Sequence, residues 1–313
     1  MSAHQEIDLD IVGKLELLTE RLQRTVDSVG YGLLRSGPPF DSKTVDYADL
    51  LVQLHPAWTQ ATSSQDVDAR FRTWILSCGF RDVVEAVQLF ASSSRDVLSA
   101  VHALANGLRV DSLGAWLDQD RKKRNEFARL GGLPKKLEGL GRVCGSQRSP
   151  LEPQMLSINR VRNCLVHDDG VVARGVANDK QSPLTMEWIG VCLVNYGAGE
   201  IRHKSELPAG GVIEITPVKR ARTYEPNSTV LIGVQEFSEV CFTAFAFCQS
   251  LVELMFEHAE SIGFRLNADQ MSHWKRRCPI AIGVEVRGND RRLLAAVEWV
   301  RGELRVDFDW RPE

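Results

Sequence analysis

Residues 158–170 read INRVRNCLVHDDG, and the fold prediction starts from this stretch. Ile158, Val161 and Leu165 recur at steps of three and four residues, which predicts a helix with one apolar face against a core. Gly170 closes the stretch and predicts the end of the helix, because a glycine commonly follows the last helical turn. The stretch therefore predicts a core helix that carries polar side chains near its carboxyl end.

Four of these polar side chains are suited to phosphate chemistry. Arg160 and Arg162 present planar guanidinium groups, which can bind a phosphate through two hydrogen bonds. Asn163 adds an amide, and His167 adds an imidazole at the negative end of the helix dipole, where a positive charge is favoured. A group that moves protons beside a fixed cation is what attack of a ribose 2′-hydroxyl on the adjacent phosphate requires.

Helix geometry divides these side chains between two faces. At about 100° per residue, Arg162 and His167 lie about 140° apart. Arg160, Asn163 and His167 share one face, whereas Arg162 falls near the apolar stripe. Arg162 and His167 would converge only if the helix loosened at its end, close to residues 168–170.

The string Arg162-Asn163-x-x-x-His167 resembles the signature of HEPN domains (higher eukaryotes and prokaryotes nucleotide-binding). The context is also similar, because the motif lies late in a helical region, 66–262, and a further long helix is predicted at 235–262. Members of this family include toxin ribonucleases, antiphage effectors and CRISPR-associated ribonucleases. The resemblance implies metal-independent cleavage of single-stranded RNA in a composite active site, and hence a homodimer.

Carried over by position, the resemblance implies that Arg162 contacts the scissile phosphate, His167 is the general acid or base, and Asn163 orients the arginine or the substrate. Arg160 also satisfies the spacing of the signature and is the second candidate for the arginine. Asp168 is a candidate supporting residue. The acidic pair Asp168 and Asp169 departs from the pattern of the HEPN signature, because two carboxylates beside the histidine repel RNA phosphate.

Two other interpretations of the motif stay open. One is a catalytically silent HEPN domain that binds a nucleotide or a partner protein. The other is a helical interaction protein in which Arg162 pairs with a buried carboxylate and His167 caps the helix. A regulatory partner is a further expectation, because a toxic ribonuclease activity has to be held in check.

Composition sets limits on these hypotheses. The 313 residues are 43% hydrophobic and 25% charged, with a net charge of -3, so any RNA-binding surface has to be local. Seven cysteines without a CxxC pair predict buried thiols in a reducing cytoplasm. We expect no metal and no cofactor, since HExxH spacing and a P-loop are both absent. We also expect no membrane span and no secretory signal, and we interpret 240–256 as a buried core helix.

The sequence predicts a mainly α fold, an HEPN-like helical bundle, with a β-rich insertion and a small α+β extension. We expect an N-terminal helical segment and loop at 1–65, the helical domain at 66–262 with its insertion at about 184–234, and a β-rich extension at 263–313. The predicted helices lie at 7–29, 45–54, 66–91, 94–106, 112–130, 134–143, 153–168 and 235–262. The predicted strands lie at 186–194, 211–218, 229–234, 280–286, 295–300 and 303–309.

Overall fold

The computed structural model describes residues 11–35, 64–109, 112–144, 147–172, 183–195, 199–201, 213–263, 286–288, 291–300 and 303–312. The helices in these ranges are α1 (Ile11–Arg35), α2 (Ser64–Ala105), α3 (Leu113–Ala128), α4 (Gly132–Val143), α5 (Glu152–His167) and α6 (Val234–Ser261). The strands are β1 (Leu184–Asn195), β2 (Gly199–Ile201), β3 (Ile213–Tyr224), β4 (Val286–Gly288), β5 (Arg291–Val300) and β6 (Glu303–Pro312). Helices predominate, which confirms the mainly α class; the more specific HEPN-like bundle stays a prediction.

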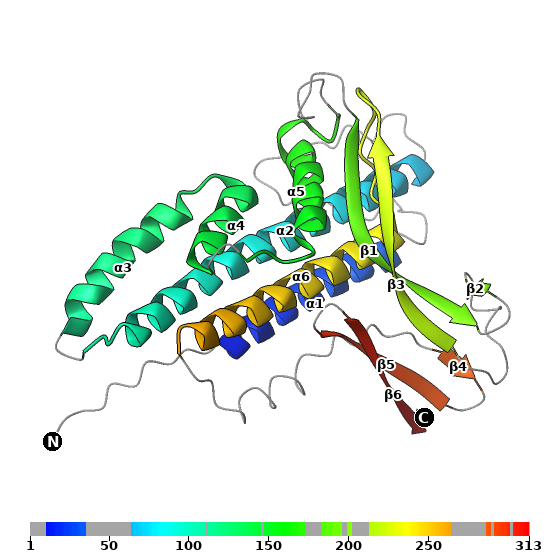
Figure 1. The fold of residues 1–313 in the computed structure, drawn as a ribbon. Helices are drawn as coiled ribbons and strands as arrows, with labels where there is room; N and C mark the ends of the chain where they lie inside the picture. The colour runs from blue at the N-terminus through cyan, green and yellow to red at the C-terminus, as the bar shows by residue number, and fades with distance from the viewer. Residues whose placement is uncertain are drawn as a thin grey trace, which may run out of the picture.

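Three long helices, α1, α2 and α6, run side by side through the structure (Figure 1). They share one hydrophobic core with α4, α5 and β1, and Phe80 of α2 and Phe245 of α6 are among its fully buried side chains. In the described part of the chain, α6 is the one helix long and apolar enough to cross a bilayer. However, 78% of its most apolar window is buried inside the protein, as in the core helix of a soluble protein.

Glycines allow α1 and α2 to approach closely. A Cβ at Gly32 would lie 2.1 Å from Cδ1 of Ile75, and a Cβ at Gly79 would lie 2.5 Å from Cγ2 of Val29. We expected the first helix to end at Gly30 and Gly32, and this was wrong, because α1 continues to Arg35. The packing contact that Gly32 permits opposes its weak helix propensity.

The helix α2 is continuous over 42 residues, so the prediction of two separate helices joined at residues 92–94 was wrong. Ser92 donates a hydrogen bond to the carbonyl of Gln88, four residues earlier, instead of capping a new helix. Ser94 is fully buried in the core-facing stripe. The predicted stop was right, since α2 ends before Gly107, whose φ is 76°.

The first sheet has the strand order β2-β1-β3, and β1 pairs with β3 over the full length of both strands. On its other edge, β1 pairs with β2 only at residues 193–195. At two further residues of β1, hydroxyl groups of helices bond to the backbone of the strand. Ser157 of α5 accepts a hydrogen bond from the N–H of Glu187 at 2.8 Å, and Thr243 of α6 accepts one from the N–H of Ile189 at 2.9 Å. The β1 strand is therefore held between α5 and α6.

The remaining predictions met different outcomes. Helices α3 to α6 lie within a few residues of their predicted ranges, and the C-terminal hairpin is confirmed by the pairing of Val300 with Glu303. The predicted strand at 229–234 was wrong, because only Thr229 forms a bridge and α6 already begins at Val234. The predicted helix at 45–54 lies outside the described residues, as does most of the predicted strand at 280–286.

Candidate functional site

The helix α5 carries the candidate site. Its predicted apolar stripe is confirmed as buried, because Ile158 and Val161 are fully enclosed and Leu165 is 5% exposed. These side chains face the core, where α5 packs against β1, α2 and α6. A proline in the first turn is compatible with the start of the helix, since it has no N–H to leave unsatisfied. The core contacts therefore determine which side chains of α5 face outward.

The helix does not loosen inside the motif. It stays α-helical through His167, and the N–H groups of Asp168 and Gly170 both donate to the carbonyl of Cys164 at 3.1 Å. The chain then turns through two left-handed positions, Asp169 with φ 51° and Gly170 with φ 76°. On this regular helix, Arg162 and His167 stay about 140° apart. The convergence that would follow from a loosened end is not present within one chain.

Arg160, Asn163 and His167 lie along one face of α5. Arg160 and His167 are exposed, and Asn163 is half-buried. The imidazole of His167 makes no hydrogen bond or ion pair with any of the described residues, so it does not cap the helix. This face therefore presents a guanidinium, an amide and an imidazole within about two helical turns.

Arg162 has a different environment. Its side chain is half-buried, and its Nη1 donates to Oδ1 of Asn163 at 3.3 Å. Its Nε is buried and has no hydrogen-bond partner among the described residues. No described carboxylate pairs with Arg162, which argues against the interpretation that it neutralises a buried acid. Arg162 thus contacts Asn163 directly, while its guanidinium retains unused donors.

The chain segment after the motif is firmly held. The N–H of Val230 donates to the carbonyl of Gly170 at 2.7 Å. The N–H of Val172 donates to Ser228 at 2.9 Å, and the N–H of Asn227 donates to Val172 at 2.8 Å. These bonds join the exit of α5 to the segment that leads into α6. They fix the position of the exposed histidine relative to the core.

No protein-family model, curated protein or solved structure matches this chain. The assignment of chemical roles to the α5 side chains therefore depends on their own geometry and on the resemblance of the motif.

Cys164 lies inside the motif but is unsuited to nucleophilic chemistry. Burial raises the pKa of its thiol, and the nearby charge of Asp168 raises it further. Its Sγ also lies 3.3 Å from the carbonyl of Val171, to which it can donate. A thiol with a raised pKa is a poor nucleophile, because the thiolate is the reactive form. Cys164 therefore packs the helix exit, as the sequence predicted.

The structure brings together two histidines that lie far apart in the sequence. His102 lies in the last turn of α2 and His258 in the last turn of α6, and their Nε2 atoms are 2.8 Å apart. They are separated by 156 positions in the chain, so no local spacing could have indicated the pair. His203 and His273 lie outside the described residues. Among the described residues, no group of three or more typical metal ligands comes together.

Another polar cluster joins α1 to α2. Asp82 accepts hydrogen bonds from Arg21, at 2.5 Å, and from Thr25. Glu85 is 3.5 Å from the same Arg21. Burial by itself raises the pKa of Asp82, but the hydrogen bonds and the positive charges of α1 outweigh it, and the net pKa is lowered. These acids stabilise the α1–α2 contact and, among the described residues, make no hydrogen bond or ion pair with the α5 motif.

Proposed function

We propose that this chain is an HEPN-type endoribonuclease that cleaves single-stranded RNA as a homodimer, without a metal, in cytoplasmic toxin or antiphage defence. The observation that supports this proposal is the state of His167. Its imidazole is exposed and unpartnered among the described residues, at the end of a helix whose exit is held by backbone hydrogen bonds. Arg160 and Asn163 extend along the same face, so proton transfer and phosphate binding are available side by side.

The proposed reaction uses only RNA and side chains. The ribose 2′-oxygen attacks the adjacent phosphorus and transfers its proton to a neutral His167 imidazole. The bond from phosphorus to the 5′-oxygen breaks, and the leaving 5′-oxygen receives this proton from the imidazolium of His167. The products are a 2′,3′-cyclic phosphate and a 5′-hydroxyl. An arginine stabilises the negative charge that develops on the phosphate oxygens.

The divergence of Arg162 from His167 supports a composite site. Because α5 stays regular, these two side chains of one chain do not face a common phosphate. In a two-fold dimer, each residue of one surface meets the partner's copy of that surface, so His167 of one chain can lie opposite an arginine of the other.

The two candidate arginines have different roles in this proposal. Arg160 is exposed on the histidine face and is placed to contact a phosphate bound there. Arg162 contacts Asn163 and has an unpartnered, buried Nε, so it either orients the amide or reaches a phosphate from the partner's side. The resemblance favours Arg162 and the exposure favours Arg160, so both are tested separately.

The test is cleavage of a labelled single-stranded RNA in the presence of EDTA. We expect the wild-type protein to release products with cyclic phosphate ends, and His167→Ala to lose activity by at least about a hundredfold, the usual contribution of a general acid or base. Arg160→Ala and Arg162→Ala show which arginine contributes more. Arg129→Ala removes an equal charge from an exposed position at the end of α3 and serves as the matched control. Wild-type cleavage that persists in His167→Ala would refute the proposal.

The composite arrangement has its own test. Heterodimers with His167→Ala in one chain and an arginine-to-alanine variant in the other are purified through two different tags. If each site takes its histidine and its arginine from different chains, one of the two sites stays intact, and the heterodimer keeps about half of the wild-type activity. Inactive heterodimers with both Arg160 and Arg162 variants would show that the site is not shared in this way.

A catalytically silent HEPN module that binds a nucleotide or a partner protein is the second candidate. The acidic pair Asp168 and Asp169 favours it, since both carboxylates lie directly after His167 and oppose the approach of RNA phosphate. This candidate predicts no cleavage of RNA under any ionic condition. It also predicts that His167→Ala leaves toxicity in expressing cells unchanged, whereas the ribonuclease proposal predicts that this variant relieves toxicity.

A further inference from the structure

A cavity of about 670 Å³ opens between the carboxyl-terminal part of α2, the helix α3 and the end of α4, and no residue of the α5 motif lines it. Figure 1 shows how these three helices lie relative to α5. Its lining includes three cationic side chains, Arg95, Lys123 and Arg142, together with His102 and the half-buried indole of Trp116. No carboxylate is among the lining residues that the structure describes. The volume is in the range of sites for small organic ligands.

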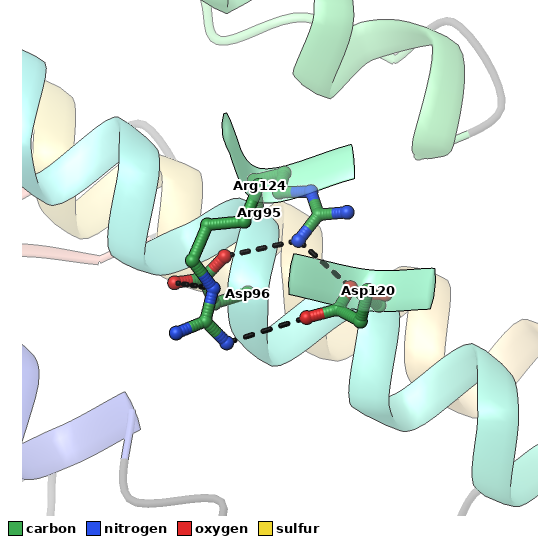
Figure 2. A network of polar contacts seen from close by, with 5 residues as sticks. Arg95, Asp96, Asp120 and Arg124 are labelled. Atoms are coloured by element: carbon green, nitrogen blue, oxygen red, sulfur yellow. Dashed lines mark hydrogen bonds and ion pairs between the residues drawn. The ribbon is translucent and has the colours of Figure 1, made fainter. Parts of the chain in front are cut away.

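One wall of the cavity is fixed by a network of four charged residues. Figure 2 shows Arg95 of α2 between Asp96, on the same helix, and Asp120 of α3. The Nη1 of Arg95 lies 3.1 Å from Asp96 and 2.8 Å from Asp120, and Arg124 is 3.3 Å from each of the same two carboxylates. Two arginines and two aspartates neutralise each other, so the network adds no net charge to the cavity.

Burial stabilises the geometry of this network. The side chains of Arg95 and Asp120 are 8% and 3% exposed, and Ser99 donates a hydrogen bond to Asp120 at 2.6 Å. Burial raises the pKa of Asp120, but the Ser99 hydrogen bond and the charge of Arg95 outweigh it, so the pKa is lowered and the carboxylate stays ionised. Arg95 is therefore held in place at the cavity wall by a partner that does not itself line the cavity.

Two lining cations lie outside this neutral network. Lys123 is exposed and makes no ion pair with the residues that the structure describes. Among the described residues, Arg142 pairs only with Glu138 of its own helix, at 2.5 Å, and the two side chains are 75% and 53% exposed. An exposed pair of this kind contributes little stability, so the Arg142 side chain can leave Glu138 and bind an anion with a small loss of free energy. The cavity thus carries two uncompensated or weakly compensated positive charges beside an aromatic wall.

We propose that this cavity binds a small phosphorylated molecule. Lys123 and Arg142 contact its phosphate groups, Arg95 in its neutral network forms a fixed wall, and Trp116 covers an organic part of the ligand. Charge-assisted hydrogen bonds to phosphate are among the stronger polar contacts in proteins, and two cations from different helices specify a ligand that bridges α3 and α4. This site is separate from the proposed RNA site, so neither depends on the other.

Isothermal titration calorimetry with pyrophosphate tests the charge contribution. We expect saturable binding to the full chain, weakened by about tenfold or more in the double variant Lys123→Ala/Arg142→Ala, since each lost charge-assisted contact changes affinity by about that factor. Lys122→Ala/Arg129→Ala removes the same charge from exposed positions outside the cavity lining and is the matched control. All four positions are exposed, so the variants should fold, which thermal denaturation checks.

Two further comparisons define the outcome. Phenyl phosphate should bind more tightly than inorganic phosphate, and Trp116→Ala should remove that difference. His167→Ala should bind pyrophosphate as the wild type does, whatever its effect on RNA cleavage. The proposal is overturned if wild-type protein shows no binding of pyrophosphate at millimolar concentration. It is also overturned if the control double variant loses as much affinity as the cavity variant, because the attraction would then be non-specific.

Discussion

Removal of the Ser157 hydroxyl should lower the free energy of unfolding by more than the loss of one buried oxygen atom would by itself. Ser157 is 1% exposed, accepts the N–H of Glu187 at 2.8 Å and can donate to the carbonyl of the same residue at 3.0 Å. In Ser157→Ala, this N–H and carbonyl face an alanine methyl at a part of the β1 edge where none of the described strands pairs. Leaving a buried donor without a partner costs roughly 1–3 kcal/mol, and the lost volume is only one oxygen atom.

The assay is urea denaturation followed by far-ultraviolet circular dichroism. The matched control is Ser250→Ala, because Ser250 is similarly buried, at 4% exposed, but its hydroxyl contacts only the Ser149 hydroxyl and the Phe247 carbonyl. We expect the midpoint of unfolding to fall more in Ser157→Ala than in Ser250→Ala, with the same slope in both. Equal losses would refute the view that Ser157 replaces a neighbouring strand.

The same reasoning extends to the other helix that holds β1. Thr243 of α6 is fully buried and accepts the N–H of Ile189, so Thr243→Val, which keeps the volume, should also cost roughly 1–3 kcal/mol. Because Ser157 and Thr243 contact different residues of β1, the double variant should lose about the sum. A double variant no weaker than the single ones would show that one of the two contacts does not contribute.

Two more predictions concern the helical core and its pH dependence. Gly79→Ala should destabilise the protein by about 1–3 kcal/mol, because the new Cβ would lie 2.5 Å from Val29 and 2.9 Å from Phe237. In Gly30→Ala the new Cβ meets no atom within 4 Å, so this variant should stabilise the protein by up to about 1 kcal/mol. Urea denaturation of both variants checks that the two changes in stability have opposite signs. Burial, and then the proximity of the other histidine, lower the pKa of His258 below its ordinary 6.5, so the folded state binds this proton less readily than the unfolded state. The free energy of unfolding should therefore fall as the pH drops from 6.5 towards the lowered pKa, and His258→Gln should flatten this part of the stability profile; an unchanged profile would contradict the assignment.

Local patterns predicted most of the helices because each has an apolar stripe that repeats at helical spacing. The exception is instructive. Three consecutive serines at 92–94 favour a break between the predicted helices 66–91 and 94–106, yet Ser94 continues the stripe from Val87 and Ala91 to Leu98, and Ser92 bonds back to a carbonyl of its own helix. A serine inside a helix can bond the carbonyl four residues earlier, so its preference for helix ends is weak enough for core packing to override. The periodicity was the stronger signal, and it indicated a continuous helix.

Contacts between distant residues could not be predicted in this way. The hydroxyls of Ser157 and Thr243 have no local signature, and they acquire a role only when α5 and α6 lie against the open edge of β1. The pair His102 and His258 exists because the ends of α2 and α6 come together. The cavity beside Arg95 depends on the placement of three helices. The sequence could identify these residues but not their neighbours.

The candidate site shows what the structure adds to a motif. From the sequence, Arg162 and His167 could converge if the end of the helix loosened, so a site within one chain was conceivable. The bonds from Asp168 and Gly170 to Cys164 close the helix after His167, and this removes that option. An active site that uses both residues must then include a second chain, whereas a site within one chain must use Arg160. The ribonuclease hypothesis thus becomes a choice between two arrangements, and the heterodimer experiment distinguishes them.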